Sequence, residues 1–235
     1  MNCLIIAAGE GRRLRDVSPS KPLTPIAGMP LIERVIRAAA AGGATTFTVV
    51  TGHEAGRVEA FLARLSEFPI RAVRTADWSL PNGHSVLTGA EAIEGDYLLT
   101  MSDHLFDPAI VRRLIGAPPA ALTLAVDRDL ANPLLDMDDA TKVETGPSGA
   151  IRNIGKGLAH FDAIDTGLFR ATPALAEAIG AGGSLSEGVQ RLADRGRALT
   201  LDVTGARWLD VDDPGSLAKA ERMLGQATAA TSLSA

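Results

Sequence analysis

The feature that most constrains the fold is a short apolar stretch near the amino terminus that runs directly into a glycine-rich loop. Residues 3–8 are all apolar, and Gly9 and Gly11 follow at once. An apolar run of this length bounded by glycine is typical of a strand buried in a parallel sheet. Because glycine has no side chain, such a loop lets a ligand approach the backbone, and its free N–H groups can bind phosphate oxygens.

Positive charge is concentrated in and after this loop. Residues 10–25 include four basic and two acidic side chains, in a chain whose net charge is −5. A basic patch on an acidic protein indicates a small anionic ligand, and it argues against nucleic acid or an anionic membrane surface as a partner. The spacing is not that of a dinucleotide-binding loop, because Leu14 stands where the third glycine would be, and the chain has no Walker-type G-x-x-x-x-G-K-[ST] string.

Strand-like and helix-like segments alternate along the rest of the chain. Strands are expected over 3–8, 47–51, 70–73, 97–101, 122–126, 164–170 and 199–203, a hairpin over 141–154, and helices over 31–41, 54–65, 84–92, 185–194 and 214–224 and from about 108. This alternation predicts an α/β fold, with a Rossmann-like, doubly wound, mostly parallel sheet in one domain over 1–225. The segment 226–235 is expected to be a disordered tail.

Composition bears on whether the protein is expected in a membrane, outside the cell or in the cytoplasm. A hydrophobic content of 46% permits a sizeable core, and no apolar run approaches the roughly 18 residues that a membrane span needs. The first strand begins without a basic leader or cleavage site, and the single Cys3 has no internal partner for a disulfide. We therefore expect a soluble, cytoplasmic protein; association into homodimers stays open.

Three carboxylates follow a predicted strand or precede the last helix. Asp103 follows the strand at 97–101, and Asp210 and Asp212 lie just before the helix at 214–224. Ligands bind beyond the carboxyl ends of parallel strands, so these carboxylates could meet a phosphate loop there and hold Mg²⁺. Asp212 or Asp213 could instead cap the last helix. For Asp212 the cap and ligand roles are weighed equally, whereas the ligand role is favoured for Asp210. None of the histidines has a zinc spacing; His104, beside Asp103, is the one to test first.

Strings distributed along residues 3–224 resemble the sugar nucleotidyltransferases, and within that family the inositol-1-phosphate cytidylyltransferases. They include A-A-G-E-G-R-R at 7–13, K-P-L at 21–23, P-L-I-E-R at 30–34, V-T-G at 50–52, N-G-H-S-V at 82–86, D-H at 103–104, A-T-K-V-E at 140–144, I-G-K at 154–156, D-T-G-L-F at 165–169, S-L-S-E-G-V at 184–189 and W-L-D-V-D at 208–212. The resemblance implies the GT-A-like form of the α/β fold. It also implies that a phosphomonoester attacks the α-phosphate of a nucleoside triphosphate and releases pyrophosphate, with CTP and inositol 1-phosphate as the pair.

The same resemblance implies a role for each matched residue. For the nucleotide these are Ala8, Gly9, Gly11, Arg12 and Arg13 at the β- and γ-phosphates, Lys21 at the α-phosphate, and Asn82, Gly83 and Ser85 at the base and ribose. For the acceptor they are Lys156 at its phosphate, with Lys142, Asp165, Thr166, Gly167 and Glu187 around it. Asp103, Asp210 and Asp212 would hold Mg²⁺, and Lys21, Arg13 and Asp103 would carry the catalysis.

Other functions remain open from the sequence. A uridylyltransferase for a sugar 1-phosphate, or a cytidylyltransferase for phosphocholine or an aminophosphonate, would use the same reaction. Choline head groups usually bind in an aromatic box, and the chain has only two Trp, one Tyr and six Phe. A nucleotide-binding module without catalysis would be expected to lack one of the key polar residues, but Lys21, Asp103 and Asp210 are all present.

Overall fold

The computed structural model describes residues 1–232, and its elements follow the alternation expected from the sequence. The strands are β1 (Asn2–Ala7), β2 (Pro25–Ile26), β3 (Met29–Pro30), β4 (Thr46–Thr51), β5 (Ile70–Arg74), β6 (Tyr97–Met101), β7 (His104–Phe106), β8 (Leu122–Asp127), β9 (Lys142–Thr145), β10 (Ile151–Gly155), β11 (Ala163–Ala171), β12 (Ala198–Asp202) and β13 (Trp208–Asp210). The helices are α1 (Leu31–Ala41), α2 (Ala55–Leu62), α3 (Asn82–Ala90), α4 (Pro108–Ile115), α5 (Ala174–Ile179), α6 (Leu185–Ala193) and α7 (Pro214–Ser232), with 3₁₀ turns η1 (Arg12–Leu14) and η2 (Lys21–Leu23).

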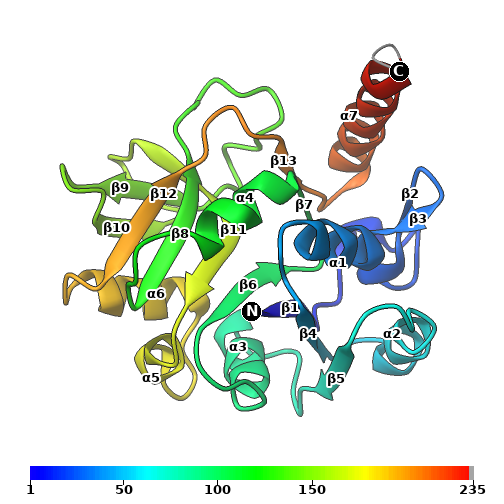
Figure 1. Cartoon of the computed structure of the whole chain (residues 1–235), viewed down its shortest axis with the longest axis horizontal. Coiled ribbons are helices and arrows are strands. Elements are labelled where there is room, and N and C mark those ends of the chain that lie inside the picture. Colours follow the sequence, from blue (N-terminus) through cyan, green and yellow to red (C-terminus); the bar gives the residue numbers. More distant parts are fainter. Residues whose placement is uncertain (233–235) are drawn as a thin grey trace.

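Alternate residues of β1 face two separate hydrophobic layers. Cys3 and Ile5 pack with residues of α1, α2 and α4 on one face of the sheet, whereas Leu4 and Ile6 pack with residues of α3, α5 and α6 on the other. This is the period of two that a strand imposes, here with both faces buried. Figure 1 shows the helices on the two sides of the central sheet. The doubly wound α/β fold predicted from the sequence is therefore confirmed.

The central sheet is parallel in its first part and antiparallel around β11. Its strand order is β10-β9-β11-β6-β1-β4-β5, with β8 pairing with β11 and β12 pairing with β8. β1 pairs in parallel with β4 and β6, and β4 with β5. β11 runs antiparallel to β6, β8 and β9. The carboxyl ends of β1 and β6 consequently lie side by side, and the segments that follow them meet there.

A short ribbon joins the middle of the chain to its last strand. β7 and β13 pair antiparallel, with His104 opposite Asp210, and the Val211 N–H donates to the Asp103 carbonyl at 3.0 Å. The sequence analysis did not predict β7 or β13, because strands of three residues are too short to show a period of two. This ribbon brings the two predicted carboxylate segments together.

The last helix extends further than the sequence analysis predicted. α7 continues through Ser232 instead of ending near Leu224, and the alanines of this segment favour a helix. The first part of the predicted tail, 226–232, is therefore helical in the structure, whereas 233–235 lie outside the described residues. The domain boundary at 225 stays a prediction.

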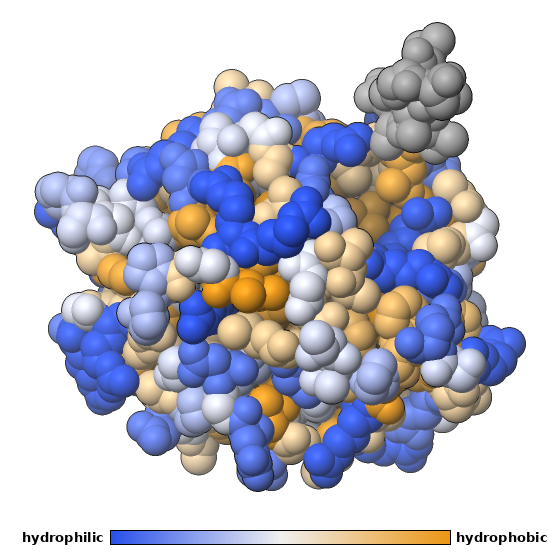
Figure 2. Space-filling model, in the orientation of Figure 1, coloured by the Kyte–Doolittle hydropathy of each residue, from blue (hydrophilic) through white to orange (hydrophobic). Residues whose placement is uncertain are grey.

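The helices and the surface can be compared with what a membrane-spanning protein would need. Within the described part of the chain, no helix combines the length and the apolar character that crossing a bilayer requires. In Figure 2 hydrophilic residues cover most of the face that is coloured, with apolar residues in smaller areas among them.

Candidate active site

Lys21 lies at the centre of a cluster of carboxylates. Its Nζ donates to Asp103 Oδ2 at 2.5 Å and also to Asp212 Oδ1, and its side chain is 10% exposed. Burial by itself would lower the pKa of Lys21, but the negative charges of Asp103, Asp212 and Asp210 outweigh it and raise that pKa. The buried ammonium is therefore charged at neutral pH, and it stands where the carboxyl ends of β1 and β6 meet.

His104 is the second cation of the cluster. Its Nδ1 lies 2.7 Å from Asp103 Oδ1 and 3.9 Å from Asp210 Oδ1. Burial by itself lowers the pKa of His104, but Asp210 and Asp103 raise it to about 9. Burial raises the pKa of Asp103, yet Lys21 and His104 more than reverse this and hold it well below its usual range. Asp103 is thus an ionised carboxylate held by two cations.

The carboxylates of this cluster fit a divalent cation. One potential ligand atom each from Asp103, His104 and Asp210 lie within 4.8 Å of one another. Asp210 Oδ1 is buried, and it has no hydrogen-bond partner among the residues that the structure describes. Mg²⁺ prefers oxygen ligands, and a protonated His104 cannot be one. Asp103 and Asp210 are therefore the two side chains of this group that could offer oxygen ligands to the ion. The metal role of Asp212, whose carboxylate binds Lys21, stays a prediction.

The cap of α7 is Asp213 and not Asp212. Asp213 Oδ1 accepts a hydrogen bond from the Ser216 N–H at 2.8 Å, at the position of an N-cap. The carboxylate of Asp212 instead binds Lys21 and lies 3.2 Å from the Arg13 guanidinium. The sequence left Asp212 open between cap and ligand, and the structure leaves its carboxylate facing the cluster.

The glycine loop packs directly against Lys21. Gly11 has a φ of +61°, and a Cβ at this position would lie 2.3 Å from the Cβ of Lys21. Gly11 therefore has two reasons to be glycine: its left-handed backbone and the close approach of the lysine. A Cβ at Gly9 would meet nothing within 4 Å, so the loop has open space beside it.

Arg12 and Arg13, which directly follow Gly11, pair with different carboxylates. Arg13 binds Asp139 Oδ2 at 2.7 Å as well as Asp212. Arg12 is 79% exposed and pairs with Glu10. The structure therefore brings Arg13 to the carboxylate cluster, but it does not bring Arg12 there.

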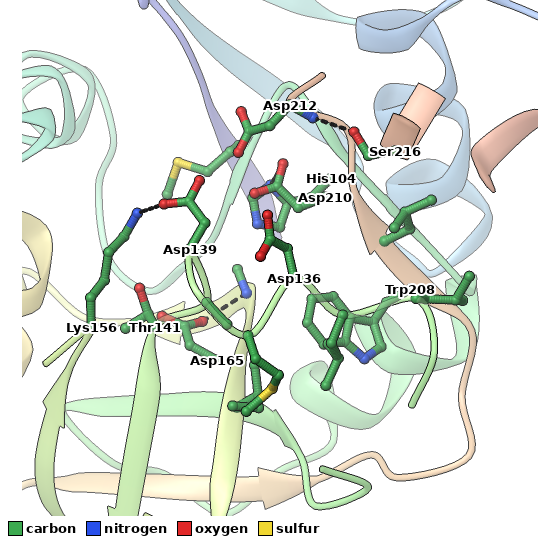
Figure 3. A pocket seen from close by; sticks show the side chains of 18 of the residues that line it. His104, Asp136, Asp139, Thr141, Lys156, Asp165, Trp208, Asp210, Asp212 and Ser216 are labelled. Atoms are coloured by element: carbon green, nitrogen blue, oxygen red, sulfur yellow. Dashed lines mark hydrogen bonds and ion pairs between the residues drawn. The ribbon is translucent and has the colours of Figure 1, made fainter. Parts of the chain in front are cut away.

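A pocket of about 600 Å³ opens beside the cluster. Figure 3 shows the carboxylates of Asp136, Asp139, Asp210 and Asp212 converging toward its centre, with Lys156 at one side and Trp208 at the other. Residues that line it include Asn82, His104, Leu134, Leu135, Met137, Thr141, Asp165, Gly167, Leu185, Ser186, Ser216 and Lys219. The pocket is thus acidic with apolar walls, and a polar molecule that contains hydroxyl or ammonium groups could bind there.

Asp165 lies at the base of this pocket (Figure 3). Its Oδ1 accepts the Gly167 N–H at 2.7 Å. Burial raises the pKa of Asp165 to about 6, although the Gly167 N–H and the charge of His104 both act to lower it. With this pKa the carboxyl group is mostly ionised at neutral pH and accepts hydrogen bonds, and its protonated form, populated near and below pH 6, can also donate one.

Three residues predicted at the acceptor have other partners in the structure. Thr166 is fully buried and donates to the Ala125 carbonyl at 2.8 Å. The Nζ of Lys142 donates to the Lys156 carbonyl at 2.9 Å. Glu187 forms a capping box with Ser184 at the start of α6. None of the three is among the lining residues of the pocket, so the acceptor roles predicted for Thr166, Lys142 and Glu187 are not supported by the geometry.

Of the residues predicted at the base and ribose, Asn82 lines the pocket, whereas Gly83 and Ser85 do not. Asn82 lines the pocket, and its Oδ1 accepts the Leu185 N–H at 3.0 Å. Gly83 serves packing, because a Cβ there would lie 2.1 Å from the Gly183 carbonyl oxygen. Ser85 is buried on α3 and does not line the pocket. Ala8 is buried at the end of β1, where its carbonyl accepts the His53 N–H.

Sequence reasoning missed the segment that covers the pocket. Residues 128–141 connect β8 to β9, and they supply Asp136 and Asp139. The segment has no helix or strand of its own. The acidic string D-M-D-D at 136–139 was the one signal in the sequence that could have identified it.

A glycine-rich loop, a buried lysine and three aspartates that the ends of β6 and β13 bring together are features of the nucleotide-using class of α/β transferases. The chain belongs to the family of MobA-like NTP transferase domains, whose model matches residues 3–135. It is therefore a nucleotidyltransferase, as the sequence analysis predicted.

Several curated proteins are similar over nearly the whole chain. The bifunctional IPC transferase and DIPP synthase of Rubrobacter xylanophilus is 35% identical over 228 residues, which are 94% of this chain and 51% of that protein. The protein of the same name from Aquifex aeolicus is 30% identical, with the same coverage. The CMP-5'-(3-aminopropyl)phosphonate synthase of Streptomyces rubellomurinus is 31% identical over 94% of this chain and 38% of that protein. The chain thus spans about half or less of the length of these relatives.

Two solved structures share the fold. The inositol-1-phosphate CTP transferase from T. maritima superposes with a TM-score of 0.84 at 21% identity, covering 94% of this chain and 96% of that one. A UDP-glucose pyrophosphorylase complexed with UDP-glucose gives a TM-score of 0.77 at 17% identity, covering 96% and 98%. At these identities the likeness concerns the fold.

Proposed function

We propose that this protein transfers a cytidylyl group from CTP to inositol 1-phosphate and releases pyrophosphate. The observation that carries the proposal is the charged Lys21, held by Asp103 and Asp212 beside the glycine loop. Asp212 also lines the pocket, and so does Lys156. Basic groups for two phosphorylated substrates thus contact neighbouring carboxylates: Lys21 pairs with Asp103 and Asp212, and Lys156 pairs with Asp139.

The reaction needs no covalent intermediate with the protein. An oxygen of the acceptor phosphate attacks the α-phosphorus of CTP in line, and the bond to the bridging oxygen of pyrophosphate breaks, so that pyrophosphate leaves with the electron pair. Lys21 stabilises the charge that develops on the α-phosphate. The glycine loop and Arg13 bind the β- and γ-phosphates, and Lys156 orients the acceptor phosphate. Asp103, Asp210 and Asp212 would hold Mg²⁺, which neutralises triphosphate charge when bound.

The choice of acceptor is supported by the polar groups of the pocket and by the relatives. Asp136, Thr141, Asp165 and Ser186 line the pocket and offer hydrogen bonds to a ring of hydroxyl groups. A site built around hydroxyls discriminates strongly against analogues that leave its polar groups unpaired. The relatives named IPC transferase, and the fold neighbour named inositol-1-phosphate CTP transferase, favour the same pair of substrates.

A second candidate is cytidylyl transfer to an aminophosphonate. The carboxylates of Asp136, Asp139 and Asp165 in the pocket could pair with an ammonium group as well as with hydroxyls. The Streptomyces relative, named as a synthase of a CMP-aminopropylphosphonate, favours this alternative at 31% identity.

A substrate panel tests both candidates. Pyrophosphate release is measured with Mg²⁺, with CTP or UTP, and with inositol 1-phosphate, glucose 1-phosphate, phosphocholine or 3-aminopropylphosphonate as acceptor. We expect the highest kcat/KM with CTP and inositol 1-phosphate, and no release from Lys21→Ala above the background. If another pair wins by about tenfold, equivalent to about 1.4 kcal/mol, the substrates proposed here are wrong while the reaction class stands.

We also propose that the protein works in the cytoplasm, where nucleoside triphosphates are abundant. Whether it forms homodimers is a prediction that its molar mass in solution, from light scattering, would test.

A further inference from the structure

One carboxylate joins two cations that come from distant parts of the chain. Asp139 Oδ2 binds the Arg13 guanidinium at 2.7 Å, and its Oδ1 binds the Lys156 ammonium. Figure 3 shows the Lys156–Asp139 pair at the side of the pocket. Arg13 lies in η1 after the glycine loop, whereas Lys156 directly follows β10. Lys156 and Arg13 together lower the pKa of Asp139 to about 2, so the bridge is ionic at neutral pH.

Under the proposed function these two cations bind phosphates of different substrates. Carboxylate and phosphate oxygens compete for the same N–H donors, so a phosphate that binds Arg13 or Lys156 must displace Asp139. The side chains of Arg13 and Lys156 are 52% and 60% exposed. Ion pairs at such exposure change an equilibrium by about two- to fivefold each, which a phosphate can overcome readily.

We propose that Asp139 is a positioning residue that holds Arg13 and Lys156 in the absence of substrates and couples the binding of the two substrates. The proposal rests on the proposed function, because it assigns Arg13 to the nucleotide and Lys156 to the acceptor. It adds a residue that the reaction chemistry does not itself require.

Coupling follows because a single carboxylate serves both cations. When the phosphates of a nucleotide bind Arg13, their charge repels Asp139, and Lys156 loses its partner before the acceptor arrives. The acceptor phosphate then binds without displacing a carboxylate. By linkage, an acceptor that binds first favours the nucleotide by the same factor.

The segment that contains Asp139 has contacts that do not depend on the two ion pairs, so it can stay in place when they break. Leu135 and Met137 pack against the main hydrophobic layer. The Asp136 carbonyl accepts the N–H groups of Asp139 at 3.2 Å and Ala140 at 2.8 Å. Asp139 can therefore leave the two cations by a local movement of a turn and return when product departs.

Calorimetric titration with two probes that cannot react tests the coupling. Inorganic pyrophosphate with Mg²⁺ probes the Arg13 side, and inositol 1-phosphate probes the Lys156 side; together they give no product, because no α-phosphorus is present. We expect Asp139→Asn to bind each probe alone about two- to fivefold more tightly than the unchanged protein. In the unchanged protein each probe should strengthen the other, and most of this coupling should be lost in the variant.

Asp138→Asn is the matched control. Asp138 is exposed on the same turn, and within residues 1–232 its carboxylate has no ion pair or hydrogen bond to a side chain, so the variant removes the same charge without touching the bridge. Its affinities and coupling should equal those of the unchanged protein, and thermal unfolding confirms that both variants are folded. In turnover, Asp139→Asn should lower KM for both substrates with a smaller change in kcat.

The outcomes separate this proposal from the proposed function. Weaker or unchanged binding of pyrophosphate by Asp139→Asn would overturn the role of Asp139, and so would an equal gain in Asp138→Asn. If inositol 1-phosphate binds neither protein, the proposed acceptor is wrong, while the pyrophosphate titration still decides whether Asp139 competes for Arg13.

Discussion

Gly167 is a strand residue that packs directly against His104 of the charged cluster. It is part of β11, its φ is +74°, and a Cβ there would lie 2.1 Å from Cδ2 and 2.3 Å from Nε2 of His104. Gly167→Ala must therefore adopt an unfavourable backbone conformation and also displace a buried imidazole. Because His104 contacts Asp103, the displacement reaches the candidate metal ligands.

The magnitude follows from two contributions. The left-handed conformation costs an alanine about 1–2 kcal/mol, and forcing a methyl group into a packed site costs about 1–3 kcal/mol more. We expect Gly167→Ala to lose about 2–5 kcal/mol of unfolding free energy, which for a chain of this size lowers Tm by roughly 4–20 °C. Its kcat should fall as well, because the imidazole that holds Asp103 has moved.

Gly95→Ala separates the two contributions. Gly95 has the same φ of +74°, but a Cβ there would meet nothing within 4 Å. This variant should lose about 1–2 kcal/mol and keep its activity. Urea unfolding, followed by pyrophosphate release from each folded protein, compares the two variants. If their unfolding free energies agree within about 0.5 kcal/mol, His104 moves aside without loss of stability, and the expected cost of the steric conflict at Gly167 is wrong.

Four further predictions concern single side chains. Asp103→Asn should reduce kcat by about 100-fold or more without loss of the fold, and near-normal turnover would exclude Asp103 from the mechanism. Lys21→Ala should lower kcat more than it weakens CTP binding, whereas Arg13→Ala should chiefly raise KM for CTP, as steady-state kinetics would show. Cys3 is buried, which raises its pKa to about 12, so a thiol reagent should label it in urea and not in the folded protein. Burial raises the pKa of Asp165 from 3.8 to about 6, so its protonated form favours the folded state. As the pH rises from 4 to 6, the unfolding free energy should therefore fall relative to that of Asp165→Asn. Parallel curves of unfolding free energy against pH for the two proteins would contradict this.

The sequence predicted the parts of the site that follow long, regular elements. β1 and β6 are mostly apolar and buried, so the positions of the glycine loop and Asp103 could be inferred from where each strand ends. Glu187 shows the opposite case. The string S-L-S-E at 184–187 is a capping-box pattern, and the structure contains the capping box. Here the local pattern described the residue better than the resemblance did.

The remaining parts depend on contacts that no local pattern reveals. Asp139 lies in a segment with no secondary structure and contacts Arg13, from which it is far separated in the sequence. The choice between Asp212 and Asp213 as cap depends on the position of Ser216 within one turn of helix. Neither the hydrophobic periodicity nor the composition of the sequence predicts such contacts between particular side chains, which only the tertiary structure shows.

The ribbon of β7 and β13 also bears on when the protein becomes active during its synthesis. Every strand of the nine-stranded sheet lies before residue 203, and a growing chain can form that sheet before β13 has been made. Asp210 and Asp212 reach the cluster only when β13 pairs with β7. An unfinished chain on the ribosome would therefore carry the glycine loop and Lys21 with one of the three carboxylates, and it would have a nucleotide-binding fold before it could act on a nucleotide.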